Sequence, residues 1–170
     1  ISFATLCTET GVTAADLKAA DALTTGTINA TTVTNISGKA ADIISVFTSG
    51  GISNLGTAET LTITDNPTVT QLNSILGYTT APVTATVSAS MADLNSLTET
   101  GNNLTISVTG DYTTAELTAL SAKTIGTVTT NAGSTLTGTY ATVLAAAQGA
   151  NFNASTAVTV TVAAAFAAVV

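Results

Sequence analysis

The chain contains no histidine, no arginine and no tryptophan, and it has a single cysteine in 170 residues. The commonest general base and a frequent metal ligand are therefore absent, as is the guanidinium group that clamps carboxylates and phosphates. The lone Cys7 excludes an intrachain disulfide and a thiolate metal cage. Neither a Gly-rich phosphate loop nor a Gly-x-Ser-x-Gly elbow occurs. We therefore expect no enzyme activity, no catalytic residue, no metal site and no cofactor.

Charge is also scarce, because only 8% of the residues are charged and the net charge is −7. A chain with so few cations is a poor partner for nucleic acid or for an anionic lipid surface. The apolar run 157–170 is shorter than the 18–20 residues that a membrane span needs, so we expect no membrane insertion. A mildly acidic surface of Thr, Ser and Asn is typical of an extracellular or cell-surface protein. The chain begins at Ile1 without a charged n-region, which indicates a processed protein or a piece of a longer one.

What the chain has in abundance is threonine, arranged in a motif that repeats about six times. Each copy joins a Thr/Val-rich alternating run to a short helix-like run of the form Ala-x-acidic-Leu-x-x-apolar. The central apolar residues are spaced by 26, 29, 22, 23 and 27 residues, taken as successive differences of their numbers. They are Leu17, Ile43, Leu72, Leu94, Leu117 and Leu144. A period of this size indicates a solenoid, in which each unit buries its apolar face against its neighbours.

The helices are predicted over 13–23, 38–47, 68–76, 90–97, 113–120 and 139–147. The strands are predicted over 2–8, 26–34, 60–64, 82–88, 103–109, 126–130 and 157–162. Strands that alternate apolar residues with Thr bury one face only, and strands joined through helices run parallel with right-handed crossovers. We expect an α/β fold, a one-sided right-handed solenoid with a parallel sheet, forming one domain over 1–170 of about six to seven strand–helix units. Further repeats or a polymerised assembly would extend this domain.

The ends of these helices carry their own signals. Thr13, Ser90 and Asp111 are predicted to cap three helix starts, and Asp65 or Asn66 is predicted to cap a helix that begins at Pro67. Glycines follow three helices and are predicted to take the left-handed conformation that ends a helix. They are Gly50, Gly51, Gly77 and Gly101.

Two stretches resemble a known family. Residues 31–66 resemble the Thr/Ala-rich repeats of giant secreted surface proteins of marine picocyanobacteria and other aquatic bacteria. The matching positions are Ala30 to Thr34, Ile36 to Gly38, Ala40 to Asp42, Ser49, Gly51 to Ser53, Leu55, Gly56 and Glu59. Residues 83–110 are similar to a second unit of the same family, with Ser88-Ala89-Ser90 in place of Ser-Asp-Thr and Lys39 in place of a Thr in the first stretch. The resemblance implies an extracellular structural or adhesive protein and no catalytic residues.

Three other patterns have competing interpretations. An acidic column (Asp16, Asp42, Asp93 and Glu116, with Gln71 in the same place) could bind Ca²⁺, but first-turn acids that complement the helix dipole explain it better. The Thr-x-Thr strands could bind ice or a glycan, or simply cover a wet sheet face. Asp65 and Asp111 both follow strands and could form a carboxylate pair for polysaccharide cleavage, although no aromatic sugar platform accompanies them.

We expect the chain to be a structural repeat module of a fibre, surface layer or adhesin that acts through end-to-end stacking. An ice- or glycan-binding module is the alternative, and a virion fibre component is a third. No charged residue occurs from 124 to 170, and apolar residues lie near both ends of the chain. The partners would be copies of itself or flanking repeats of the same chain, with a glycan as a further candidate. The residues predicted to self-associate are Phe3, Leu6, Val160, Val162 and Phe166.

Overall fold

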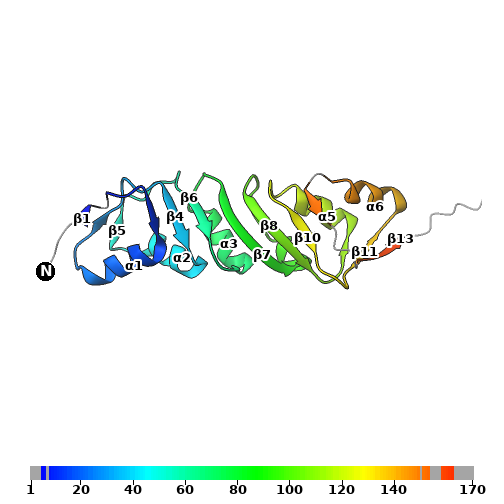
Figure 1. Cartoon of the computed structure of the whole chain (residues 1–170), viewed down its shortest axis with the longest axis horizontal. Coiled ribbons are helices and arrows are strands. Elements are labelled where there is room, and N and C mark those ends of the chain that lie inside the picture. The colour runs from blue at the N-terminus through cyan, green and yellow to red at the C-terminus, as the bar shows by residue number, and fades with distance from the viewer. Residues whose placement is uncertain (1–4, 7, 150, 154–157, 163–170) are drawn as a thin grey trace, which may run out of the picture. The chain divides into compact units, whose positions relative to one another are not determined.

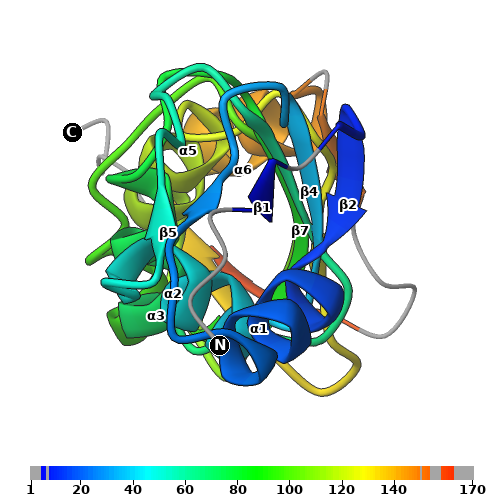
Figure 2. The ribbon, with the colours of Figure 1, turned by 90° about the vertical axis from the view of Figure 1, so that its left-hand side faces the viewer.

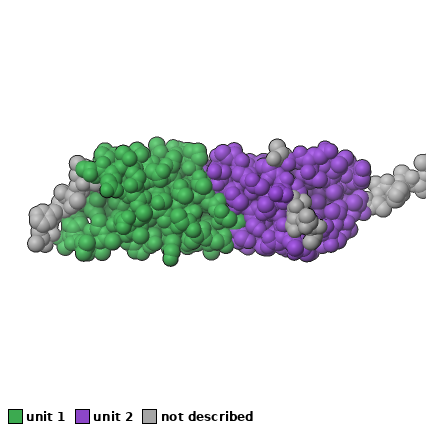
Figure 3. Space-filling model, in the orientation of Figure 1, with its two compact units in different colours: residues 1–87 green, residues 88–170 purple. Residues whose placement is uncertain are grey.

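A computed structural model describes residues 5–6, 8–149, 151–153 and 158–162 of the chain. Two compact units divide it, residues 1–87 and residues 88–170 (Figure 3). The described residues form a mixed α/β fold with six helices and mostly parallel strands, which confirms the predicted fold class at that level. Each unit is described by itself below, and the assignment of one domain to 1–170 stays a prediction.

The six helices coincide with the six repeated motifs (Figure 1). Unit 1 contains α1 (Ala14–Leu23), α2 (Ala40–Thr48) and α3 (Val69–Leu76). Unit 2 contains α4 (Met91–Leu94), α5 (Thr114–Ser121) and α6 (Tyr140–Ala147). Successive helices pack on one another, α1 on α2, α2 on α3 and α5 on α6. The predicted helices are therefore confirmed in place, although α4 is only four residues long.

One predicted register within these helices is wrong. The central apolar residue is the fourth after the N-cap in the first five helices, as Leu117 is after Thr113. The N-cap of α6 is Thr139, whose side chain accepts a hydrogen bond from the Thr142 amide. The fourth residue after it is Val143, so Leu144 takes the next position round the helix and is exposed.

The strands of unit 1 form two parallel rows. In one row β3 pairs with β1 on one side and β5 on the other, and the other row has the order β7-β6-β4-β2. The first row consists of β1 (Thr5–Leu6), β3 (Ile28–Asn29) and β5 (Ile52–Ser53). The second consists of β2 (Gly11–Thr13), β4 (Asn35–Gly38), β6 (Thr60–Ile63) and β7 (Val83–Ser90), the last three residues of which belong to unit 2.

The described strands of unit 2 also lie in two parallel rows. The orders are β12-β10-β8 and β13-β11-β9. The first row consists of β8 (Asn103–Thr109), β10 (Val128–Thr130) and β12 (Phe152–Asn153). The second consists of β9 (Tyr112–Thr113), β11 (Thr135–Gly138) and β13 (Thr159–Val162).

The prediction of one strand per repeat is wrong, because most repeats contain two. The predicted strand 26–34 shows the reason. It ends at Asn29, whose side-chain Oδ1 accepts hydrogen bonds from the Thr31 amide and hydroxyl, so the chain turns at Ala30–Val33 before β4 begins. The strands that the sequence analysis missed are β2, β4, β5, β9, β11 and β12.

Alternation decides which side chains enter the core. In β7 the buried residues are Val83, Ala85 and Val87, whereas Thr84 and Thr86 face solvent. In unit 1 the helices and the two strand rows surround the apolar interior (Figure 2). This corrects the expectation of one sheet covered by helices on one face, because the second strand row also closes the core. The prediction that the strands keep a wet Thr face is confirmed.

The helix-end predictions hold in part. Thr13 and Ser90 cap α1 and α4 as predicted, but α3 and α5 are capped by Thr68 and Thr113 in place of the acids predicted from the sequence. Those acids reach a neighbouring repeat instead, as Asp65 shows by accepting a hydrogen bond from the amide of Ala40, the first residue of α2 (2.9 Å).

The four glycines predicted to be left-handed do not behave alike. Gly101 has φ 80° and takes the predicted conformation. Gly77 has φ −75° and is right-handed, and Gly50 and Gly51 are not among the described residues with positive φ. Gly51 lies against the Asp21 carboxylate, so a Cβ there would have to displace that side chain.

Candidate functional site

The acidic column marks helix starts. The Asp16 Oδ2 atom accepts a hydrogen bond from the hydroxyl of the N-cap residue of its helix at 2.6 Å, and Asp93 Oδ2 does so at 2.7 Å. Glu116 Oε2 accepts from both the hydroxyl and the amide of Thr113 at 2.8 Å. Backbone and side-chain hydrogen bonds from Thr113 hold the pKa of Glu116 below its ordinary value. These carboxylates complete the caps of their own helices, which supports the dipole interpretation.

The fourth acid of the column is engaged differently. Asp42 Oδ1 forms an ion pair with Lys18 Nζ at 2.7 Å, which joins α2 to α1. Within the described residues, no three or more Asp, Glu, Cys or His side chains lie close enough together to hold a metal ion. Gln71 stands in the same column and serves the α3 capping box.

Asp65 and Asp111, considered as a hydrolytic pair, also have structural partners. Asp65 accepts from the backbone of α2, and Asp111 Oδ1 accepts from the amide of Thr135 at 2.8 Å. The two acids belong to different compact units. The structure therefore assigns each acid to the backbone of a neighbouring repeat.

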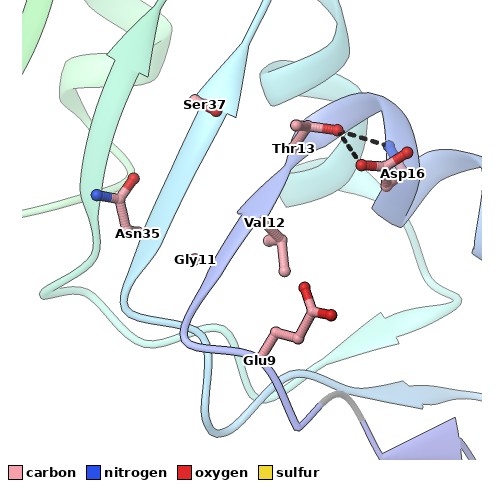
Figure 4. A pocket seen from close by; sticks show the side chains of 7 residues that line it. All are labelled: Glu9, Gly11, Val12, Thr13, Asp16, Asn35 and Ser37. Atoms are coloured by element: carbon pink, nitrogen blue, oxygen red, sulfur yellow. Dashed lines mark hydrogen bonds between the residues drawn. The ribbon is translucent and has the colours of Figure 1, made fainter.

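One open pocket of about 360 Å³ lies on unit 1 over β2 and β4 (Figure 4). Its lining mixes polar and apolar surface in similar amounts and consists of Glu9, Gly11, Val12, Thr13, Asp16, Asn35 and Ser37. Thr13 and Asp16 bond to each other as the start of α1, so two of its polar groups are already used in helix capping (Figure 4). The pocket contains no aromatic ring against which a sugar could stack.

The Thr-rich faces form short rows. In unit 2 the parallel register places Thr135 opposite Thr159, and Thr137 opposite Thr161. Thr113 continues the second row, but its hydroxyl is used in the cap of α5.

Elsewhere the strand hydroxyls bond to the preceding repeat, as Thr60 does to the Thr34 carbonyl (3.3 Å) and Thr129 does to the Ile106 carbonyl (3.1 Å). The ice-binding alternative requires a regular hydroxyl grid over several strands. These Thr hydroxyls join repeats and cap helices, whereas in unit 1 the register aligns Thr13, Ser37, Thr62 and Thr84 across four strands.

Four exposed apolar or aromatic side chains lie on the last described helix and strand of unit 2. We call this surface the C-terminal face and define it by Tyr140, Leu144, Val160 and Val162. These side chains belong to α6, the last described helix, and to β13, the outermost strand of its row (Figure 1). All four are large, apolar or aromatic, and exposed.

Two positions of the C-terminal face, those of Val160 and Tyr140, are buried in earlier repeats. Tyr112, Leu136 and Val160 are register partners on successive strands, and their exposed fractions are 3%, 4% and 48%. The first residues of α4 and α5 are buried to a similar degree, whereas Tyr140, the first residue of α6, is 73% exposed. A residue at these positions is buried where a further described repeat follows it, and exposed in the last described repeat.

The residues predicted to self-associate have three different outcomes. Val160 and Val162 lie on the C-terminal face. Leu6 lies in β1, opposite Asn29 in the parallel register. Phe3 and Phe166, like Cys7, lie outside the described residues.

The sequence analysis missed Tyr140 and Leu144 as members of this face. Counting from the N-cap Thr139 would have identified both positions as ones that face the next repeat.

Comparisons with known proteins give no relative of this chain. No family model, no curated protein and no solved structure matches it. In the part of the chain that the structure describes, no helix combines the length and the apolar character needed to cross a membrane.

Proposed function

We propose that this chain is an extracellular structural repeat module, a right-handed α/β solenoid whose copies stack end to end in a fibre, surface layer or adhesin. The observation that carries the proposal is the C-terminal face, where positions that are buried inside the stack become exposed in the last described repeat. In a repeat array each unit is stabilised by its neighbours, so an open end is a ready surface for another unit.

The bonds between repeats support the same proposal. Lys18 pairs with Asp42, Asp65 caps α2, and Lys123 Nζ donates to the carbonyl of Asn95 at 2.9 Å. Each of these polar side chains bonds to a neighbouring repeat, which is a structural role. The outward Thr and Ser residues and the scarcity of charge agree with a solvated surface scaffold outside the cell.

The proposal commits to a second copy of this chain as the occupant of the C-terminal face. Burying the exposed half of a valine side chain such as Val160 contributes about 1 kcal/mol per contact, and several such contacts act together at one face. A head-to-tail contact whose rotation does not close into a ring generates a filament.

The test is sedimentation velocity and electron microscopy of the whole chain over a concentration series. We expect particles that lengthen with concentration, and we expect the Val160→Asp variant to stay small because it places a charge in the buried contact. The matched control is Ile125→Asp, which alters an equally apolar residue that is 70% exposed at a turn away from this face. A wild-type chain that remains monomeric at the highest concentrations, or a Val160→Asp variant that assembles normally, would overturn the proposal. Antibody labelling of intact, unpermeabilised source cells tests the extracellular location.

A further inference from the structure

Neighbouring helices in unit 1 touch at a fixed pair of positions. Lys18 is the fifth residue after the α1 N-cap Thr13 (18 − 13 = 5), and it pairs with Asp42. Asp42 is the third residue after the α2 N-cap Lys39 (42 − 39 = 3). Position five of one helix therefore faces position three of the next.

Unit 2 shows the same pairing. Asn95 is the fifth residue after Ser90, the N-cap of α4 (95 − 90 = 5). Its side-chain amide donates to Glu116 Oε1 at 3.5 Å, and Glu116 is the third residue after Thr113 (116 − 113 = 3). Two unrelated chemistries, an ion pair and an amide–carboxylate contact, thus occupy one geometric slot.

A second slot lies near the helix C-termini. Asp21, eight residues after its N-cap (21 − 13 = 8), accepts a hydrogen bond at 2.6 Å from Ser49, ten residues after its own (49 − 39 = 10). Phe47 (47 − 39 = 8) stacks on Tyr78 (78 − 68 = 10), with ring centroids 4.8 Å apart and an interplanar angle of 3°. Position eight of one helix therefore faces position ten of the next.

In α6 the corresponding forward positions have no following helix among the described residues. Counting from Thr139, position five is Leu144 and position eight is Ala147 (144 − 139 = 5; 147 − 139 = 8). Both side chains are exposed. At these two positions α6 therefore presents apolar side chains, whereas α1 presents the charged Lys18 and Asp21.

Positions three and ten of a helix face the preceding helix, and in α1 no preceding helix lies among the described residues. Position three is Asp16 and position ten is Leu23 (16 − 13 = 3; 23 − 13 = 10), and Leu23 is 89% exposed. Leu23 follows Lys18 by five residues, which at about 100° per residue places it roughly 140° round the helix from the side that meets α2. An exposed leucine thus stands on the face of α1 that no described helix covers.

We propose that α6 of one copy packs on α1 of a second copy in the register used inside the chain, with Ala147 against Leu23 and Leu144 against Asp16. This inference rests on the proposed function, and it adds which helices meet and at which residues. The second copy is the occupant because α1 supplies an exposed apolar side chain at the slot where α6 supplies an exposed alanine. A contact of α6 with another α6 would place two forward faces together, an arrangement that no helix pair within the units uses.

Cysteine crosslinking of the whole chain tests this register. In a Cys7→Ser background, the double variant Leu23→Cys with Ala147→Cys should form a ladder of covalent multimers under mild oxidation. The control double variant replaces Ala22 in place of Leu23, since Ala22 is also exposed but lies about 100° round the helix. Multimers from the Leu23 pair alone support the inference. Equal crosslinking of both pairs overturns the register and leaves stacking intact. The absence of crosslinks in a chain that still assembles in sedimentation does the same. A wild-type chain that does not assemble overturns both the register and the stacking.

A charge substitution gives a second readout. Leu144→Lys should reproduce the Lys18–Asp42 pair between copies and assemble about 1.4- to 5-fold more tightly at low salt than Leu144→Gln, which loses the same apolar contact, whereas Leu144→Asp should assemble more weakly than Leu144→Gln. The gain should vanish in an Asp16→Asn background, where the helix cap can still form. A gain from Leu144→Lys that persists with Asp16→Asn would show that Leu144 meets another surface and would overturn the proposed register.

Discussion

Replacing Asp65 tests whether one repeat caps the helix of its neighbour. Lys39 occupies the N-cap of α2 and makes no side-chain cap, whereas Asp65 Oδ1 accepts the hydrogen bond from the Ala40 amide at 2.9 Å. Asp65→Ala removes this cap without touching α2 itself. Loss of an N-cap acceptor costs about 1 kcal/mol, within a range of about 0.5–2 kcal/mol. For a chain of this size that corresponds to a fall in Tm of about 2–4 °C.

A double-mutant cycle separates capping from other effects. Ala40→Pro removes the amide hydrogen that Asp65 accepts, and proline is tolerated at the first position of a helix, so Asp65→Ala should cost less than about 0.5 kcal/mol in that background. Asp65→Asn keeps an acceptor oxygen and serves as the matched control. Urea unfolding at 25 °C gives the four free energies, provided that the m-value is unchanged. If Asp65→Ala costs the same with alanine and with proline at position 40, the Ala40 amide is not what Asp65 stabilises and the reasoning fails.

Three further changes follow from the same contacts. Leu72→Ala should lower the free energy of unfolding by about 2–5 kcal/mol in urea titrations, because the side chain is fully buried. Gly51→Ala should displace the Asp21 carboxylate from Ser49 and destabilise by about 0.5–1.5 kcal/mol, the value of one hydrogen bond, whereas Gly50→Ala, with open space around it, should change little in the same assay. The folded-state pKa of Glu116 lies below its ordinary value of 4.5, so its contribution is present above that pH and is lost as the pH falls through the lower folded value. The urea midpoint of Glu116→Gln should therefore fall less than that of the wild type on acidification, by a small margin because the carboxylate is largely solvated.

The helices were predictable from the sequence because their signals are local. Thr13 and Ser90 lie next to the helices they cap, and apolar residues recur at helical spacing after them. The same locality explains the error at Leu144. Leucine and valine are adjacent there, and only the position of the N-cap Thr139 decides which of them faces the core.

The second strand of each repeat was not predictable in the same way. Its residues pair with strands 22 to 25 positions away, as Val12 does with Ile36 (36 − 12 = 24), so pairing with neighbouring repeats defines it as a strand. Short segments such as Tyr112–Thr113 carry too few residues to show an alternating pattern. The roles of Asp65 and Asp111 were missed for the same reason, because each bonds to a backbone amide in a neighbouring repeat.

The C-terminal face was also only partly predictable from the sequence. Val160 and Val162 were predicted from composition, since they lie in an uncharged apolar segment. Tyr140 follows from comparison with its equivalents, because the first residues of the other five helices are all buried. The exposure of these side chains becomes apparent only when equivalent positions of several repeats are compared, so one repeat alone does not reveal it. The bonds that join repeats, from Lys18–Asp42 to Phe47–Tyr78, use positions that α6 also presents. The contact proposed between copies therefore requires no new kind of interface, only one more use of the register that already joins helix to helix along the chain.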